Sequence, residues 1–185
     1  GLQASPAVRS AAECTEAAAD QTVLTALIEA RPLVAWEEET AALRAAIAPD
    51  RAWPPRAFLE AKVAEQRQRH ARFGDTSDNL EPNIKDGPGG LRDLHMLGWL
   101  ALRSFGVRDL DALVGLGHLG PDEAVALERE RRVLCRLRYG LHLVAGRREE
   151  RLRFDYQKLL ATRLGYVDDG DSLAVEKMMQ GFYRS

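Results

Sequence analysis

The chain has 185 residues, a formal net charge of −2, 45% hydrophobic residues and 29% charged residues, which is the profile of an ordinary globular protein. This balance argues against a nucleic-acid-binding protein, and no apolar run approaches the ~20 residues that cross a bilayer. Two cysteines exclude a disulfide-dense secreted scaffold and a four-cysteine zinc site. We therefore expect a cytoplasmic protein with reduced thiols that binds neither nucleic acid nor membrane.

The residue types favour helices. The sequence holds 27 Ala and 26 Leu, whereas Val, Ile and Thr together number 20. Ala and Leu lose little freedom in a helix, and β-branched residues lose more. We predict an all-α fold, an irregular bundle of about seven helices.

In chain order, residues 2–9 are the only candidate strand, and Pro6 allows it to be an edge strand at best. Apolar residues at helical spacing then predict helices over 11–33 and 37–47. A third helix begins near Pro54 and runs to about residue 73, where Gly74 ends it.

The second half of the chain continues this pattern after a long loop, residues 75–90. Apolar spacing, the glycines of 115–120 and a proline at a helix start define the further helices. These are predicted over 91–105, 109–114, 122–144, 155–164 and 172–183.

The long loop holds the most informative segment, residues 79–93, with the sequence Asn-Leu-Glu-Pro-Asn-Ile-Lys-Asp-Gly-Pro-Gly-Gly-Leu-Arg-Asp. Its run Gly87–Gly90 leads directly into a helix, where backbone N–H groups and the helix dipole favour an anion. Lys85 and Arg92 flank the turn and are suited to the same anion.

Two other readings of this segment stay open. The glycines can simply reverse the chain, with Arg92 and Asp93 in structural ion pairs. The acidic side chains of Glu81, Asp86 and Asp93 can either balance the cations or help to hold Mg²⁺. The segment is not the phosphate loop G-x-x-x-x-G-K-[ST], because no Lys-Ser or Lys-Thr follows the glycines.

Two basic clusters and several packing residues complete the candidates. A basic helix end is expected to be a solvated face that complements the helix dipole, with a triphosphate or protein partner as the alternative; it consists of Lys62, Arg67, Arg69, His70 and Arg72. The second cluster is expected to be a salt-bridged surface, and it consists of Arg147, Arg148, Arg151 and Arg153 with Glu149 and Glu150. Core packing is expected for Trp36, Trp53, Trp99, Cys14, Cys135, Met178 and Met179.

The run N-L-E-P-N-I-K-D-G-P-G-G-L-R-D-L-H closely resembles the signature of the bacterial bifunctional PII uridylyltransferase / uridylyl-removing enzyme family. Collinear segments that resemble the same family are A-K-V-A-E-Q-R-Q-R-H-A-R-F, V-G-L-G-H-L, L-R-Y-G-L-H-L-V, R-L-R-F-D-Y-Q and V-E-K-M-M. The resemblance therefore extends over nearly the whole chain. With no initiator Met and no cap after the last helical pattern, we expect an internal fragment.

The resemblance implies a place in a larger enzyme that transfers UMP from UTP to a tyrosine of PII in nitrogen signalling. It implies that residues 1–34 are a remnant of the nucleotidyltransferase α/β core and that 35–185 are the helical domain that follows it. Mg²⁺ and UTP are expected for the parent, and PII and the parent's other domains are the expected partners. The family's motif, a Gly-Ser turn followed by an acidic D-x-D strand, does not occur in the fragment, so we expect no catalytic or metal residue and no activity from it alone. The candidate nucleotide-binding residues are Asn83, Lys85, Gly87, Gly89, Gly90, Arg92 and Asp93.

Two alternatives remain at this stage. One is a non-catalytic helical module that binds a protein through its arginine clusters. The other is a diverged, inactive relative, because residues 3–6 read Gln-Ala-Ser-Pro where the family carries Glu-Val-Gly-His.

Overall fold

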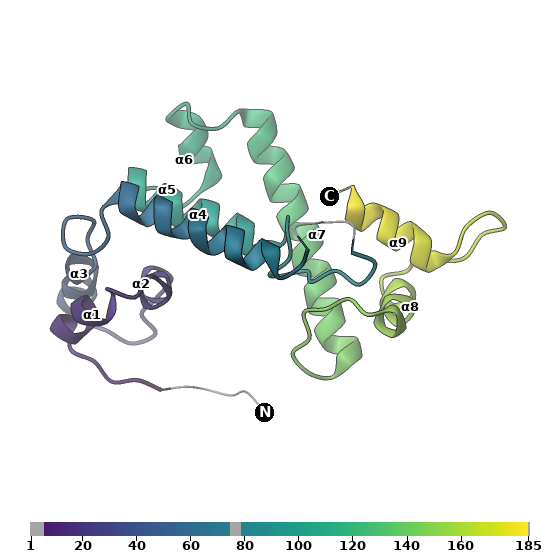
Figure 1. The fold of residues 1–185 in the computed structure, drawn as a ribbon, viewed down its shortest axis with the longest axis horizontal. Helices are drawn as coiled ribbons and strands as arrows, with labels where there is room; N and C mark the ends of the chain where they lie inside the picture. Colours follow the sequence, from purple (N-terminus) through teal and green to yellow (C-terminus); the bar gives the residue numbers. More distant parts are fainter. Residues whose placement is uncertain (1–5, 75–78, 185) are drawn as a thin grey trace. The chain divides into compact units, whose positions relative to one another are not determined.

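The computed structural model describes residues 6–74 and 79–184, and these ranges form nine helices and no strand (Figure 1). This confirms the predicted all-α class. The helices are α1 (Ala11–Ala17), α2 (Gln21–Ile28), α3 (Glu37–Ala46), α4 (Pro55–Ala71), α5 (Leu91–Phe105), α6 (Leu110–Gly115), α7 (Pro121–Ala145), α8 (Phe154–Arg163) and α9 (Ala174–Tyr183). Of the expected edge strand, residues 2–5 lie outside the described part, and residues 6–9 have no regular structure.

Proline and glycine signals placed most helix ends correctly. Helix α5 covers 91–105 as predicted, and α7 begins at Pro121. Gly74 and Gly146 follow α4 and α7 with φ of 71° and 65°, the left-handed conformation that terminates helices.

The single helix predicted over 11–33 is wrong, because the structure has two helices there, α1 and α2. The Asp20 carboxylate accepts hydrogen bonds from the backbone N–H of Thr22 at 2.6 Å and of Val23 at 3.4 Å, which starts a new helix. Residues 11–31 contain no Gly or Pro, so the apolar period alone gave no sign of the break.

The chain forms two compact units. Unit 1 consists of residues up to 63 together with 99–107, and unit 2 consists of 64–98 together with the residues from 108 onward. Helices α4 and α5 therefore contribute to both units. The boundary predicted after residue 34 concerns the parent's catalytic core and stays a prediction.

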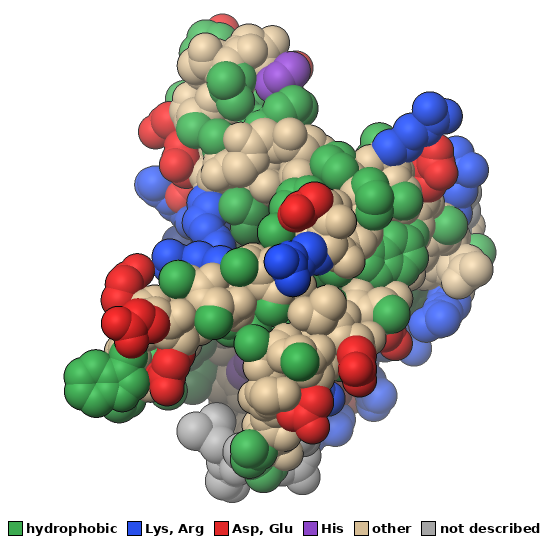
Figure 2. Space-filling view, turned by 90° about the vertical axis from the view of Figure 1, so that its left-hand side faces the viewer, with side chains coloured by type: hydrophobic (Ala, Val, Ile, Leu, Met, Phe, Trp, Pro, Cys, Tyr) green, Lys and Arg blue, Asp and Glu red, His purple; other side chains and the backbone are tan. Residues whose placement is uncertain are grey.

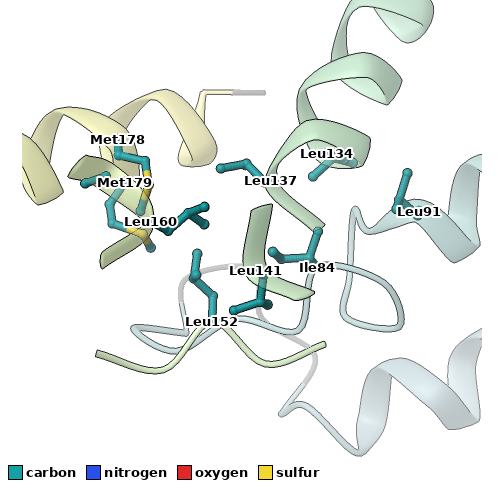
Figure 3. Packing of buried hydrophobic residues seen from close by; sticks show 10 residues of the cluster. Ile84, Leu91, Leu134, Leu137, Leu141, Leu152, Leu160, Met178 and Met179 are labelled. Atoms are coloured by element: carbon teal, nitrogen blue, oxygen red, sulfur yellow. The ribbon is translucent and has the colours of Figure 1, made fainter. Parts of the chain in front are cut away.

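The core of unit 2 lies along one face of the second half of helix α7. Figure 3 shows side chains from the 79–90 loop, α5, α7, α8 and α9 gathered at this core. Met178 and Met179 are 1% and 9% exposed, which confirms their predicted core position. The labelled members are Ile84, Leu91, Leu134, Leu137, Leu141, Leu152, Leu160, Met178 and Met179. The loop is thus anchored in the core through Ile84, which is fully buried.

Trp99 packs in the core as predicted, whereas Trp53 is only half-buried; both lie in unit 1. Trp99 is 5% exposed, and the indole N–H of Trp53 donates to the carbonyls of Ala18 and Ala19 at 3.0 Å. The prediction for Trp36 is wrong, because this side chain is 76% exposed. Trp36 ends the non-helical segment 29–36, in which every residue is exposed.

The cysteines also divide. Cys14 is buried, as predicted, but Cys135 is exposed, so its assignment to the core is wrong. Cys135 lies on α7 beside the buried Leu134, and on a helix neighbouring positions face different directions.

Candidate functional site

The loop before α5 is held against the segment after α7. The backbone N–H of Ile84 donates to the carbonyl of Glu150 at 2.9 Å, and that of Leu152 donates to the carbonyl of Pro82 at 2.8 Å. The side chain of Gln157, which is buried, donates to the carbonyl of Leu80 at 2.7 Å. These bonds fix the position from which the glycine turn begins.

Asn83 starts the turn. Its side-chain oxygen accepts from the backbone N–H of Lys85 at 3.0 Å and of Asp86 at 2.7 Å. Its carbonyl accepts from Gly87 N–H at 3.1 Å. This is the local side-chain-to-backbone bonding by which Asn favours turns.

Close approach of the backbone requires glycine at positions 87 and 90, and a left-handed conformation favours glycine at position 89. A Cβ on Gly90 would lie 2.8 to 2.9 Å from the carbonyl oxygens of Ile84, Lys85 and Gly87. A Cβ on Gly87 would lie 2.7 Å from the carbonyl oxygen of Asn83, and Gly89 has a φ of 72°. Sequence analysis pointed to these glycines for their N–H groups, but their lack of a side chain is what the turn needs.

The backbone donors of the turn already have acceptors. Gly89 N–H donates to the carboxylate of Asp93 at 2.9 Å. Gly90 N–H donates to the carbonyl of Gly87 at 2.9 Å, and Arg92 N–H donates to that of Lys85 at 2.8 Å. An anion at this turn would therefore meet side chains rather than these amides. The structure brings the seven predicted residues into one turn, and nucleotide binding by them stays a prediction.

Asp93 is the hub that joins the turn to α4. Its carboxylate accepts from Arg69 at 2.7 Å and from Gln66 at 2.9 Å, and it lies 3.0 Å from His70 Nε2. Burial alone would raise the pKa of Asp93, but the hydrogen bonds from Arg69 and Gln66, with the charges of Arg69 and His70, hold it below its ordinary value.

The basic helix end of α4 is therefore not the solvated face that was expected. Arg69 is 9% exposed and Lys62 is 3% exposed, and Arg69 also donates to the carbonyl of Asp86 at 2.9 Å. Arg67 and Arg72 are exposed, as expected. Local sequence patterns could not indicate this difference, because Asp93 is 24 positions away from Arg69.

The acidic side chains Glu81 and Asp86 of the loop balance cations. Glu81 pairs with Arg151 at 3.1 Å, and Asp86 pairs with Arg92 at 3.3 Å. Among the residues that the structure describes, no group of three or more His, Cys, Asp or Glu side chains could hold a metal ion.

None of the helices in the described part of the chain is long and apolar enough to cross a membrane.

Lys85 belongs to a second charged group with α7. Glu150 binds Arg138 through two hydrogen bonds of 2.7 Å each. Burial lowers the pKa of Lys85, and the positive charges of Arg92 and Arg138 lower it further. The negative charges of Asp86 and Glu150 raise this pKa and offset part of the decrease. Burial would raise the pKa of Glu150, but its bonds to Arg138 keep it low.

The second arginine cluster is a salt-bridged surface, as predicted. Arg147 pairs with Glu149 at 2.7 Å, and Arg148 pairs with Glu150 at 3.3 Å. Elsewhere on the molecule, on the face that Figure 2 shows, acidic, basic and hydrophobic side chains are also interspersed.

Comparison with known proteins bears directly on this chain. The family model described as GlnD PII-uridylyltransferase matches residues 57–185. The bifunctional uridylyltransferase/uridylyl-removing enzyme of Xanthomonas campestris pv. campestris (strain B100) is 74% identical over the whole chain, and that of Xanthomonas axonopodis pv. citri (strain 306) is 71% identical. The protein of the same name from Azotobacter vinelandii is 48% identical over the same 185 residues. No solved structure matches the chain.

These matches confirm the resemblance that the glycine loop and its flanking segments suggested. The chain spans 21% of the length of these relatives. The matched range includes the whole glycine turn, α4 from residue 57 onward, and every later helix. The chain therefore belongs to the GlnD PII-uridylyltransferase family.

Proposed function

We propose that this chain is the helical part of an enzyme that transfers UMP from UTP to a tyrosine of the PII signal protein. The observation that carries the proposal is the identity of 70% or more, over all 185 residues, to several relatives named as bifunctional uridylyltransferases. The catalytic carboxylates and the Mg²⁺ that such a transfer needs would come from elsewhere in the parent protein. The 185 residues would be inactive alone.

Within that enzyme, the glycine turn would help to position UTP. Asn83, Gly87, Gly89, Gly90 and Asp93 would act by shaping the turn, since their polar groups are already bonded within it. Lys85 and Arg92 would supply positive charge. This assists transfer by positioning and electrostatic stabilisation rather than by moving a proton.

The test uses the parent protein with Lys85→Ala and Arg92→Ala. We expect each substitution to weaken UTP affinity or turnover by about tenfold or more, the effect of one charge-assisted contact. Lys158→Ala is the control, because Lys158 is an exposed lysine of α8 in the same unit. Unchanged UTP affinity and turnover in both variants would refute the role of the turn.

A non-catalytic interaction module is the alternative. Calorimetric titration of the 185-residue chain separates the two, using UTP with Mg²⁺ in one arm and PII in the other. Saturable heat with UTP supports the proposed role. No heat with UTP, together with retained PII binding, would favour the module.

A further inference from the structure

The charged group around Lys85 carries an excess of positive charge. It has three cations, Lys85, Arg92 and Arg138, and two carboxylates, Asp86 and Glu150. Each carboxylate is already paired with an arginine, Asp86 with Arg92 and Glu150 with Arg138. No hydrogen bond or ion pair joins the Lys85 ammonium to any residue that the structure describes.

Three separate segments place these cations together. Lys85 follows Ile84, whose N–H is bonded to the carbonyl of Glu150 at 2.9 Å. Arg92 lies in the first turn of α5, and its N–H is bonded to the carbonyl of Lys85. Arg138 reaches the group from α7 through its two bonds to Glu150. The arrangement therefore depends on the fold, unlike a run of basic residues on one helix.

Solvent reaches the group. The side chains of Arg92 and Arg138 are 30% and 31% exposed, and that of Asp86 is 31% exposed. Lys85 is half-buried. Burial and the charge of Arg92 disfavour its ammonium form and so lower its pKa. An anion that pairs with Lys85 would relieve that unfavourable charge.

We propose that Lys85, Arg92 and Arg138 form a binding position for a pyrophosphoryl group, both as free pyrophosphate and at the end of a nucleoside triphosphate. The inference rests on the proposed function. It adds which part of the substrate is bound, the pyrophosphoryl group, and a third cation, Arg138 of α7. The contacts are made by side chains, because the amides of the glycine turn are already bonded. Cations on three segments suit a ligand with several charged oxygens better than a single carboxylate.

The test is calorimetric titration of the 185-residue chain with inorganic pyrophosphate, UTP and UMP. We expect pyrophosphate and UTP to bind and UMP to bind at least tenfold more weakly, because UMP lacks the pyrophosphoryl group. Lys85→Gln should weaken pyrophosphate binding by about tenfold or more. This variant is the decisive one, because Lys85 has no described partner whose loss would disturb the fold.

Matched variants separate the cluster from general surface charge. Lys158→Gln and Arg136→Gln are the controls, since both side chains are exposed in unit 2 and Arg136 lies two positions before Arg138 on α7. Both should leave pyrophosphate binding unchanged, whereas Arg138→Gln should weaken it. Glu150→Gln removes the competing carboxylate and should strengthen binding by roughly threefold.

Three results would overturn the inference. The first is no pyrophosphate binding by the wild-type chain, and the second is equal weakening by Lys85→Gln and Lys158→Gln. The third is weaker binding in a Glu150→Gln chain that keeps its thermal stability. If UTP binds and Lys85→Gln weakens UTP while pyrophosphate fails to bind, the inference is wrong but the proposed function stands. If neither UTP nor pyrophosphate binds the chain, and the parent variants keep their activity, both are wrong.

Discussion

The two units bury cations in different ways. In unit 2, Arg69 is paired with the carboxylate of Asp93 at 2.7 Å. In unit 1, Arg103 is 6% exposed and donates to the carbonyls of Trp53 and Ile47, at 3.0 and 2.5 Å. Lys62, also in unit 1, lies 4.7 Å from the centre of the Trp99 ring. Unit 2 thus binds its buried arginine through a carboxylate, whereas in unit 1 Arg103 is bound by backbone carbonyls and Lys62 has an aromatic ring among its contacts.

The difference follows from what each cation stabilises. Arg103 binds the carbonyl of Ile47, the C-cap of α3, where the helix dipole is negative, and that of Trp53, whose φ is 50°. Burial lowers the pKa of Arg103, and Asp50 acts in the opposite direction. Arg69 instead joins α4 to a glycine turn through a carboxylate. Removing a partner should therefore be costlier in unit 2, because it leaves a buried charge uncompensated.

Asp93→Ala should have the largest effect. It leaves Arg69 buried without its carboxylate, and we expect the free energy of unfolding of unit 2 to fall by about 3–5 kcal/mol. Urea unfolding followed by circular dichroism measures this. Tryptophan fluorescence reports on unit 1, because Trp36, Trp53 and Trp99 all lie there.

Asp171→Ala is the control for this substitution, because Asp171 is exposed and only its backbone N–H is bonded, to Asp169. A loss below about 1 kcal/mol in Asp93→Ala, the level of an exposed ion pair, would mean that the two units do not differ in the way described. An equal shift of the fluorescence and dichroism transitions would instead mean that the two units unfold together.

Arg103→Leu should have an intermediate effect. Two carbonyls lose their donor while the apolar part of the side chain is largely kept, so we expect unit 1 to lose about 2–3 kcal/mol. The fluorescence transition in urea measures it, with the exposed Arg51→Leu as the control. A larger loss than in Asp93→Ala would reverse the comparison.

The sequence predicted most features that depend on residues close together in the chain, and it did not predict features that depend on distant residues. The limits of α5 and the end of α4 were predictable, because proline, glycine and apolar spacing are local signals. The break at Asp20 was not predicted, because the alanines before Asp20 favour a helix as strongly as the residues of α1 and α2 do. A side-chain cap within an Ala-rich run is a weak sequence signal.

For the site, the sequence identified the segment but not the chemistry of its members. The spacing of Gly87, Gly89 and Gly90 indicates a tight turn. The carbonyl oxygens that surround Gly90 are evident only in the folded structure. The pairing of Arg69 with Asp93 and of Arg138 with Glu150 depends on segments that meet in three dimensions. No spacing rule along the chain encodes those contacts.

Acid should affect unit 2 through Asp93, with a smaller effect than its deletion. The pKa of Asp93 is below its ordinary 3.8 in the folded state, so its stabilisation is fully present above that value and is lost as the pH falls through the folded pKa. Asp93→Asn should remove this part of the acid dependence. Glu149, Glu150 and Asp169 also have lowered pKa values in this unit, so the measurement is the difference between wild type and variant.

That difference is obtained from urea unfolding at pH 3 to 6, followed by circular dichroism. The stability gap between wild type and Asp93→Asn should narrow as the pH falls below about 4. The stability difference between wild type and Asp93→Asn that is measured for unit 1 by fluorescence should be the same at every pH, since Arg103 does not titrate in this range. A gap that stays constant in the dichroism would show that Asp93 acts by shape and not by charge.

Trp99→Phe should have the smallest effect and tests the aromatic half of the comparison. The indole N–H donates to Glu29 at 2.9 Å, and the ring faces the Lys62 ammonium. Phenylalanine keeps an aromatic face but has no N–H and attracts a cation less, so we expect unit 1 to lose about 1–2 kcal/mol. The fluorescence transition in urea, reported by the two remaining tryptophans of unit 1, is the measurement, with Trp36→Phe as the control because Trp36 is 76% exposed. If Lys62→Met then proves more stable than wild type in the Trp99→Phe background but not in the wild-type background, the ring is what makes the buried ammonium tolerable. Equal effects of Lys62→Met in both backgrounds would instead assign that role to other contacts of Lys62.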